Sequence, residues 1–244
     1  MAETAASAYN AVAEVYDEWT STLPDTAAAV DFLAGRAARK TALEFGVGTG
    51  RVALPLAARG VEVVGVEGAD LMVERLRGRP GGQDLPVVLG DMSQIRLDRT
   101  FSLVYIVFNT FLCLLNQEEQ VRCLRNAVAH LDPDGILVTE MYVPDLRRTD
   151  ADEQRLATGS VERDRVFLEA TVHDPVRQRI RTQVVVVSEA GIRLFPNHIR
   201  YVWPAELDLM AELAGLARAE RYGGWHNEPF TAQSTKHVTV YRRA

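Results

Sequence analysis

The sequence has only two cysteines, Cys113 and Cys123, among its 244 residues. Their spacing matches no zinc or haem pattern, and two thiols cannot make the disulfide framework of a small secreted domain. We therefore predict two reduced, buried thiols that pack as small apolar side chains. We also expect no metal.

Long apolar runs and an excess of basic residues are missing as well. No run approaches the ~20 residues that span a bilayer. The N-terminal stretch MAETAASAYN lacks the charged and apolar regions of a signal peptide. The formal net charge of −6 gives no support for a basic surface that binds nucleic acid. We expect a soluble cytoplasmic protein without membrane or nucleic-acid partners.

The residues that are present suit an α/β domain. Hydrophobic residues make up 47% of the chain, which is enough for a sizeable core. From about residue 40 to residue 143, short strands that are apolar throughout alternate with helices. This pattern predicts a doubly wound, mainly parallel, Rossmann-like sheet with helices on both faces. We expect seven strands, the last two at ARAERY and KHVTVYRR, and a turn at DPDG (132–135) before the fifth strand.

The composition changes after Pro144. Residues 160–203 carry three β-rich segments, VERDRVFLEATV, IRTQVVVVSE and IRLFPNHIRYVW, separated by the turn sequences HDPVRQ and EAG. They predict an antiparallel β meander inserted into the α/β core. We expect an N-terminal helical cap at residues 1–35 and a cofactor-binding core made of residues 36–145 and 204–244. The inserted segment, residues 146–203, would serve as a substrate cap or a dimer contact.

The stretch LEFGVGTGR, at residues 43–51, places three glycines at alternating positions after a short strand. Glycine lets the backbone turn tightly and approach a ligand, and free N–H groups at the start of the next helix attract negative charge. A dinucleotide fingerprint needs a third glycine where this chain has Arg51. The loop therefore predicts a nucleotide-like ligand but weakens the pyrophosphate interpretation.

Acidic residues end the next two predicted strands. Glu67 ends VEVVGVE, where a carboxylate can accept hydrogen bonds from the hydroxyls of a ribose. Asp91 and Met92 follow the third strand, where an acidic residue can accept from an adenine amino group while methionine lies on the ring. With the glycine loop, these residues predict a cofactor that contains adenosine.

With these motifs the sequence resembles the class I S-adenosylmethionine-dependent methyltransferases. LEFGVGTGR resembles their first motif, VVGVEGADLM their second and VVLGDM their third. The resemblance covers residues 8–143 well, and the ending YGGWHNEPFTAQSTKHVTVYRR is similar to that of bacterial small-molecule methyltransferases. Close relatives in that group are amino-sugar N,N-dimethyltransferases and peptide N-methyltransferases of natural-product pathways. The motifs are specific for the cofactor and not for the methyl acceptor.

The resemblance implies a set of cofactor-binding residues. Glu44 and the backbone of Gly46 and Gly48 would meet the methionine ammonium of the cofactor, Arg51 its carboxylate and Glu67 its ribose. The other implied residues would pack the helix start, line the adenine pocket or lie beside the sulfonium: Gly50, Gly68, Ala69, Met72, Asp91, Met92, Phe108 and Asn109. The expected cofactor is S-adenosyl-L-methionine, with S-adenosyl-L-homocysteine as the product and no metal.

Tyrosines and histidines are the candidates on the acceptor side. In enzymes of this family an N-terminal helix closes over the cofactor, so Tyr9 and Tyr16 are predicted cofactor contacts. Tyr16 and His226 are the catalytic candidates. The substrate candidates are Tyr142, His198, Tyr201 and Tyr222. The arginines of the meander would form a solvent face or recognise an acidic group on the acceptor: Arg163, Arg165, Arg177, Arg179, Arg181, Arg193 and Arg200.

The resemblance implies transfer of a methyl group to a nitrogen or oxygen of a small molecule, such as an amino sugar, by in-line displacement. The first alternative is a protein or peptide N-methyltransferase. The second is an NAD(P)-dependent oxidoreductase, which Arg51 in place of a glycine disfavours. The stretch Phe108–Phe111 lacks an Asn-Pro-Pro-Tyr-like turn, so bases of nucleic acids are disfavoured acceptors. The inserted segment leaves a homodimer open.

Overall fold

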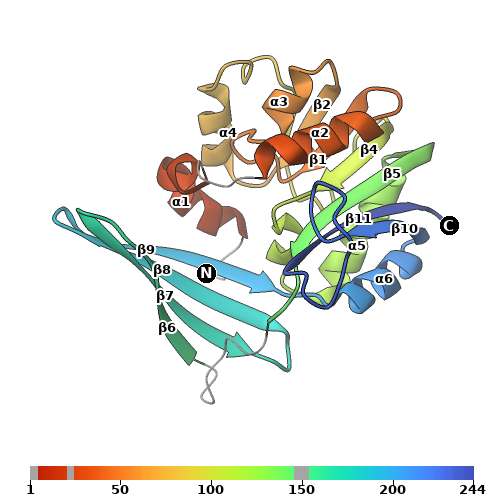
Figure 1. The fold of residues 1–244 in the computed structure, drawn as a ribbon. Coiled ribbons are helices and arrows are strands. Elements are labelled where there is room, and N and C mark those ends of the chain that lie inside the picture. Colours follow the sequence, from red (N-terminus) through yellow and green to blue (C-terminus); the bar gives the residue numbers. More distant parts are fainter. Residues whose placement is uncertain (1–4, 21–24, 146–153) are drawn as a thin grey trace.

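The computed structural model describes residues 5–20, 25–145 and 154–244, which form two sheets and the helices packed on them (Figure 1). The larger sheet has seven strands in the order β10-β11-β5-β4-β1-β2-β3. Its strands are β1 (Thr41–Phe45), β2 (Glu62–Glu67), β3 (Val87–Leu89), β4 (Phe101–Ile106), β5 (Leu131–Tyr142), β10 (Leu216–Tyr222) and β11 (Lys236–Arg243). The first five pair in parallel, and β11 is antiparallel to both of its neighbours. The predicted mainly parallel sheet of seven strands is confirmed.

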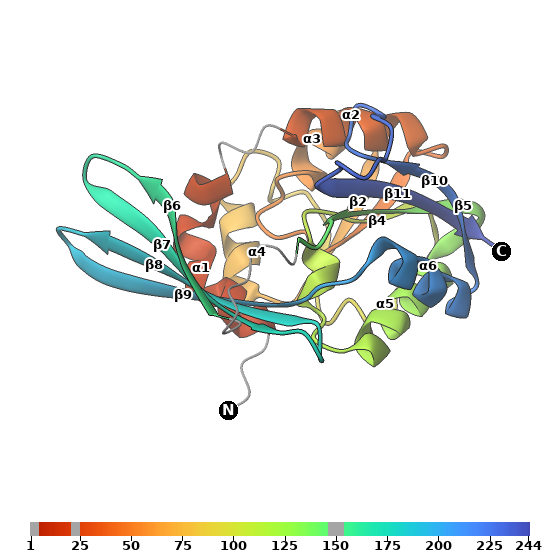
Figure 2. The ribbon, with the colours of Figure 1, turned by 60° about the horizontal axis from the view of Figure 1, so that its bottom comes forward.

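Helices cover both faces of this sheet because successive side chains of a strand point to opposite sides. On one face lie α2 (Thr26–Arg36), α3 (Ala53–Ala57) and α4 (Asp70–Arg77), and on the other α5 (Gln117–Ala129) and α6 (Pro204–Leu213) (Figure 2). In β1, Ala42 packs in the core under α2, and its neighbour Leu43 packs in the core under α5 and α6. No described helix combines the length and apolar character that a membrane crossing requires.

The strand order creates a crevice at one edge of the sheet. From β1 the chain moves outward to β2 and β3, and then returns to β4 on the other side of β1. The loops after β1 and β4 therefore leave the carboxyl edge in opposite directions, which is the usual place for a ligand in a doubly wound sheet. The glycine loop and the short 3-10 helix η1 (Thr110–Cys113) lie at this edge.

The second sheet consists of β6 (Gln154–Val161), β7 (Arg165–Asp174), β8 (Arg179–Ser188) and β9 (Gly191–Arg200), all antiparallel. The inserted meander is confirmed, but the prediction of three segments is wrong. The segment VERDRVFLEATV is divided by a turn, in which the Glu162 N–H donates to the Arg165 carbonyl (2.9 Å) and the two side chains form an ion pair (2.7 Å). The strand before this turn, RLATGSV, has few apolar residues and gave no clear signal.

The turn predicted at DPDG is also wrong. β5 runs through these residues, and its pairing with β4 shifts between Phe101, opposite Leu131, and Leu103, opposite Ile136. The extra residues bulge out of the ladder, so turn-forming residues are accommodated as an irregularity within a strand.

A buried arginine joins the second sheet to the core. Arg200, at the end of β9, is 6% exposed and donates to Gln120 of α5 and Glu206 of α6, each at 2.6 Å. It also donates to Gln178 at the β7–β8 turn (3.0 Å). The position of the sheet beside the core therefore depends on a polar network that connects three elements.

Candidate active site

The glycine loop folds back over the end of β2. The N–H groups of Gly46 and Val47 both donate to the Val66 carbonyl, at 2.8 and 3.0 Å. Gly46, Gly48 and Gly50 have φ angles of 76°, 55° and 79°, in the left-handed region that favours glycine. A Cβ on Gly46 would also collide with the Thr110 Cγ2 methyl. Both the backbone conformation and the close packing therefore require glycine here.

Glu67 lies at the centre of this loop. Its carboxylate accepts hydrogen bonds from the N–H groups of Gly48 (2.8 Å), Gly68 (2.9 Å) and Ala69 (2.9 Å). Burial raises the pKa of Glu67, although these three donors act to lower it. A carboxylate has about four acceptor sites, so this one can still receive a ligand hydroxyl.

These residues border a cavity of about 550 Å³, a volume typical of a small-molecule site. Nine residues that we predicted as cofactor contacts line it: Tyr9, Tyr16, Gly46, Gly48, Glu67, Gly68, Met72, Asp91 and Met92. The opposite wall consists of residues that the sequence analysis missed, from η1 and the start of α5: Thr110, Cys113, Leu114, Leu115, Asn116 and Glu119. One sequence signal did mark this wall: the side chain of Asn116 caps α5 by accepting from the Glu119 N–H (2.8 Å).

The N-terminal helix α1 (Ala5–Thr20) closes one side of the cavity. The rings of Tyr9 and Tyr16 make an edge-to-face contact with centroids 6.1 Å apart, and the Tyr9 hydroxyl lies 3.5 Å from the Cys113 sulfur. Asn10 caps α4 from outside, because its side chain accepts from the Leu71 N–H (3.1 Å) and donates to Asp70 (2.6 Å). The helix is therefore fixed in place over the cavity.

Six of the predicted cofactor residues lie outside the cavity lining: Glu44, Gly50, Arg51, Ala69, Phe108 and Asn109. Glu44 is 3% exposed and accepts from the Tyr105 hydroxyl (2.9 Å). Burial raises the pKa of Glu44 to about 8. The Arg51 guanidinium stacks on the Phe108 ring at 3.2 Å and donates to Thr26 (3.1 Å). Arg51 and Phe108 therefore pack on each other outside the cavity lining.

Glu140 is a further site residue that the sequence analysis missed. Phe108 and Asn109 both have positive φ, 53° and 65°, which costs free energy for residues other than glycine. The buried Glu140 carboxylate accepts from the Phe108 N–H (2.5 Å), and the Glu140 carbonyl accepts from the Asn109 N–H (3.2 Å). A lone carboxylate within the apolar run ILVTEMY was the only hint of this role.

The acceptor-side candidates other than Tyr9 and Tyr16 do not come together at the cavity. The Tyr201 hydroxyl bonds to His173 of β7 (3.1 Å), and His198 lies on β9 of the same sheet. The Tyr222 hydroxyl donates to Glu220 (2.9 Å), and His226 is exposed on the loop between β10 and β11. Tyr142 has a buried hydroxyl with no hydrogen-bond partner among the described residues. None of these five side chains lines the cavity.

Most of the meander arginines are engaged within the chain. Arg165, Arg177, Arg193 and Arg200 form ion pairs with Glu162, Asp174, Glu14 and Glu206, and Arg179 donates to the Leu115 carbonyl (2.8 Å). Five of the seven meander arginines therefore have partners within the chain, and recognition of an acidic acceptor by these arginines stays a prediction.

The cavity suits S-adenosylmethionine. The glycine loop provides an approach that a side chain would block, Glu67 provides an acceptor for ribose hydroxyls, and Met72 and Met92 provide an apolar surface for adenine. Asp91, whose oxygens bond to the Ser93 N–H (2.7 Å) and the Gln94 side chain (2.6 Å), lies on the same wall.

Comparisons with known proteins agree with this geometry. Residues 42–135 match the methyltransferase domain family. The CcbJ methyltransferase from Streptomyces caelestis is 42% identical, with a TM-score of 0.93 over 99% of this chain and 100% of that one. The cypemycin N-terminal methyltransferase from a Streptomyces species is 29% identical over 84% of this chain and 83% of its own. CalS10, an amino pentose methyltransferase from Micromonospora echinaspora, shares the fold at 23% identity, with a TM-score of 0.71 over 94% of this chain and 97% of its own.

The match to CcbJ extends over both sheets and the N-terminal helix, so the likeness is not restricted to the cofactor motifs. This likeness over the whole chain favours a methyltransferase over the NAD(P)-dependent oxidoreductase that the glycine loop alone had left open. The chain belongs to the class I S-adenosylmethionine-dependent methyltransferases, in the group that includes natural-product methyltransferases, and S-adenosylmethionine is its cofactor.

Proposed function

We propose that the chain methylates an amine nitrogen of a small natural-product intermediate, such as an amino sugar. The observation that carries this proposal is the charge of the cavity. Its described lining includes the carboxylates of Glu67, Asp91 and Glu119, and no lysine, arginine or histidine. An acidic lining favours a positively charged ligand over an anionic one, because opposite charges attract strongly in a partly buried site. The sulfonium of the cofactor and a protonated amine both meet this condition.

In this proposal the chain contributes mainly orientation and the exclusion of water. When bound, S-adenosylmethionine supplies an electrophilic methyl group for in-line attack by the acceptor. The glycine loop and Glu67 fix one end of the ligand, and α1 covers the other, so the reacting atoms are held at short range. S-adenosyl-L-homocysteine is the product, and no metal takes part.

The hydroxyl of Tyr16 serves as a hydrogen-bond donor in this scheme. Burial raises the pKa of Tyr16 above its ordinary value, although the nearby Arg51 charge opposes the shift. The group therefore stays protonated at neutral pH and does not take a proton from the acceptor. His226, our other catalytic candidate, is exposed and outside the lining. We propose that the acceptor amine loses its proton to solvent before transfer.

A peptide N-terminus is the second candidate acceptor. It is also an amine, and the relative at 29% identity is named for an N-terminal methylation. The same acidic lining would attract it. The two candidates differ in the size of the group that must enter beside α1.

Mass spectrometry of product mixtures tests the proposal. Purified protein and S-adenosylmethionine are incubated with an amino sugar, its analogue with a hydroxyl in place of the amine, a peptide with a free N-terminus, and that peptide acetylated. We expect methylation of the amino sugar and none of the hydroxyl analogue. Methylation of the hydroxyl analogue alone would refute the amine proposal, and methylation of the free peptide alone would favour the second candidate. Glu67→Ala protein, which should bind the cofactor weakly, is the control for non-enzymatic transfer.

A further inference from the structure

The second sheet has two faces with different surroundings. In an antiparallel sheet, directly opposite residues point to the same side, so the register assigns each side chain to a face. Phe195 and Arg193 of β9 point to one face, where Phe195 is 4% exposed and Arg193 pairs with Glu14 of α1 (3.2 Å). This inner face is turned toward α1, which closes the cofactor cavity.

The other face, which we call the outer face, carries two adjacent rows of uncharged and mostly aliphatic side chains. One row crosses the sheet through Val161, Val166, Val187 and Ile192. The next crosses through Thr158, Leu168, Val185 and Leu194. The exposed fractions are 73% for Val161, 68% for Ile192 and 59% for Leu194, so the described residues leave this apolar surface in contact with water.

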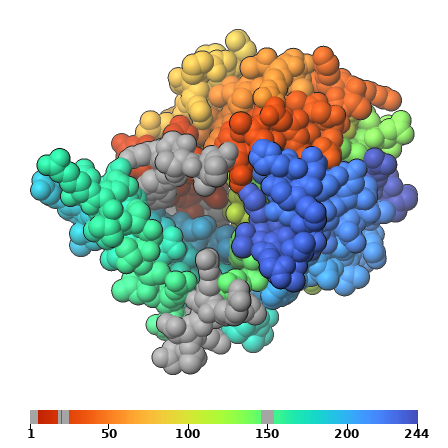
Figure 3. Space-filling view, viewed as in Figure 1, coloured from red at the N-terminus to blue at the C-terminus, as the bar shows by residue number. Residues whose placement is uncertain are grey.

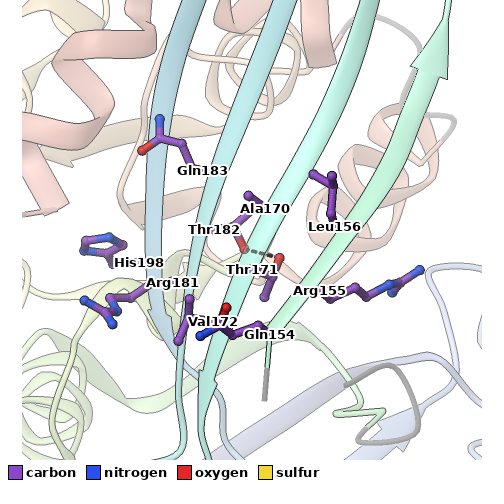
Figure 4. Close-up of a pocket in the computed structure, with 10 residues that line it drawn as sticks. All are labelled: Gln154, Arg155, Leu156, Ala170, Thr171, Val172, Arg181, Thr182, Gln183 and His198. Atoms are coloured by element: carbon purple, nitrogen blue, oxygen red, sulfur yellow. Dashed lines mark hydrogen bonds between the residues drawn. The ribbon is translucent and has the colours of Figure 1, made fainter. Parts of the chain in front are cut away.

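The outer face ends in a hollow on the side nearer the core. Its volume is about 580 Å³, and the small side chain of Ala170 lies between larger neighbours on the four strands (Figure 4). The Gln183 amide nitrogen is buried there without a hydrogen-bond partner among the described residues. Arg181 and His198 border the same hollow. The apolar rows are thus followed by a polar edge, the order found across protein interfaces.

The outer face is large enough to contribute most of a protein interface. Four strands of about ten residues, with ~3.3 Å per residue and ~4.8 Å between strands, cover roughly 600 Å² before pleating and side chains are counted. A stable interface buries about 800 Å² on each partner. A small methyl acceptor could cover only a fraction of this area. The sheet also projects from the core, so a second molecule can reach it (Figure 3).

A second copy of the chain is the occupant that this surface fits best. The two aliphatic rows carry no charge, so two copies related by a twofold axis can face each other without repulsion between like charges. Face-to-face sheets pack about 10 Å apart through interdigitated aliphatic side chains of this kind. The net charge of −6 disfavours an anionic lipid surface. We propose that the outer face of the β6–β9 sheet, centred on Val187, Ile192 and Leu194, is the interface between two copies of this chain.

The sequence left two roles open for the inserted segment, a substrate cap and a dimer contact, and this proposal assigns them to different faces of the sheet. The inner face would belong to the active-site side through α1, and the outer face to the partner copy. It does not depend on the identity of the methyl acceptor.

Sedimentation of the full chain tests the interface. We expect the wild-type protein at twice its 27.0 kDa chain mass or a higher even multiple. Ile192→Lys with Leu194→Lys should reduce the mass to half or less, because charges in the aliphatic rows must otherwise be buried. The matched control is Leu213→Lys on α6, a leucine that is 66% exposed and distant in the fold, which should leave the mass unchanged. Circular dichroism and cofactor titration show whether the variants remain folded.

Two results would overturn the proposal. One is a wild-type mass of a single chain at tens of micromolar, and the other is an assembly that the double variant leaves intact. Flotation with vesicles of phosphatidylcholine and phosphatidylglycerol is run in parallel. A single-chain mass with binding to these vesicles would assign the outer face to a lipid surface instead.

Discussion

At the scale of single residues, the site depends on buried carboxylates with different partners. Glu67 is surrounded by backbone donors, Glu44 by one tyrosine hydroxyl, and Glu140 by the N–H of a strained residue. Each has a raised pKa because burial penalises its charged form. The three glutamates therefore differ in the hydrogen bonds that they accept, and we expect substitutions of Glu67 and Glu44 to have different effects.

Glu67→Gln should weaken cofactor binding about 10–100-fold, the effect of losing one charge-assisted hydrogen bond of about 1.5–3 kcal/mol. The amide can still accept from some of the backbone donors of the glycine loop, so the fold should be kept. Calorimetric titration with S-adenosylmethionine measures the change. Glu74→Gln, an exposed glutamate on α4, is the control and should bind as the wild type does. A Glu67→Gln affinity within twofold of wild type would contradict the assigned role.

Glu44 should make stability depend on pH. Its pKa is about 8 in the folded protein and 4.5 ordinarily, so between these values the folded state holds a proton that the unfolded state has lost. The free energy of unfolding should therefore fall as pH rises through this window, by up to about 1.4 kcal/mol per pH unit from this group. Urea unfolding from pH 5 to pH 8 measures it. Glu44→Gln should flatten the slope while keeping an acceptor for Tyr105, and an unchanged slope would contradict the prediction.

At the scale of elements, the loop between β1 and α3 is defined by close packing as much as by its backbone angles. Its three glycines have positive φ, and one of them lies against Thr110 of η1. The loop therefore couples the end of β1 to the segment after β4. A pair of glycines in the chain separates the two effects.

Gly60→Ala should cost about 1–2 kcal/mol of stability, because Gly60 has φ 79° and nothing within 4 Å of an added Cβ. Gly46→Ala, at φ 76°, should cost about 1–3 kcal/mol more, because its Cβ collides with Thr110 and must displace it. Urea denaturation compares the two midpoints. Equal losses of stability in the two variants would mean that the Thr110 side chain moves away from the added methyl group at no cost.

At the scale of the whole molecule, a buried polar network helps to join the inserted sheet to the core. The side chain of Arg200 is 8% exposed and that of its partner Glu206 is 18% exposed, and together they connect the second sheet to α5 and α6. The apolar outer face lies on the far side of this connection. The residues that attach the inserted sheet to the core therefore differ from those that we propose form the contact between two copies of the chain.

Arg200→Ala should destabilise the protein by about 3–5 kcal/mol, because it leaves buried polar partners without their donor. Arg218→Ala should cost less than about 1 kcal/mol, since that side chain is 47% exposed in its pair with Asp208. Chemical unfolding followed by tryptophan fluorescence measures both. If the two losses are similar, the buried network does not anchor the sheet.

Sequence reasoning succeeded where one local pattern is tied to one physical requirement. Gly46, Gly48 and Glu67 were singled out because a left-handed loop needs glycine and a strand end can present a carboxylate, and all three line the same cavity. Both cysteines were predicted to be buried thiols, and they are free and buried. It failed at DPDG and at the first strand of the meander, where hydrogen bonding to a neighbouring strand of the sheet outweighed the local preference.

The sequence by itself determined the fold class, the cofactor motifs and the presence of an inserted β segment, because these depend on periodicity and on residues adjacent in the chain. Only the tertiary structure decided which residues share the cavity wall, that Glu140 supports Phe108, and that the inserted sheet has an inner and an outer face. Those properties depend on strand order and register, which bring together residues more than a hundred positions apart, such as Tyr9 and Cys113. No local pattern encodes such neighbours.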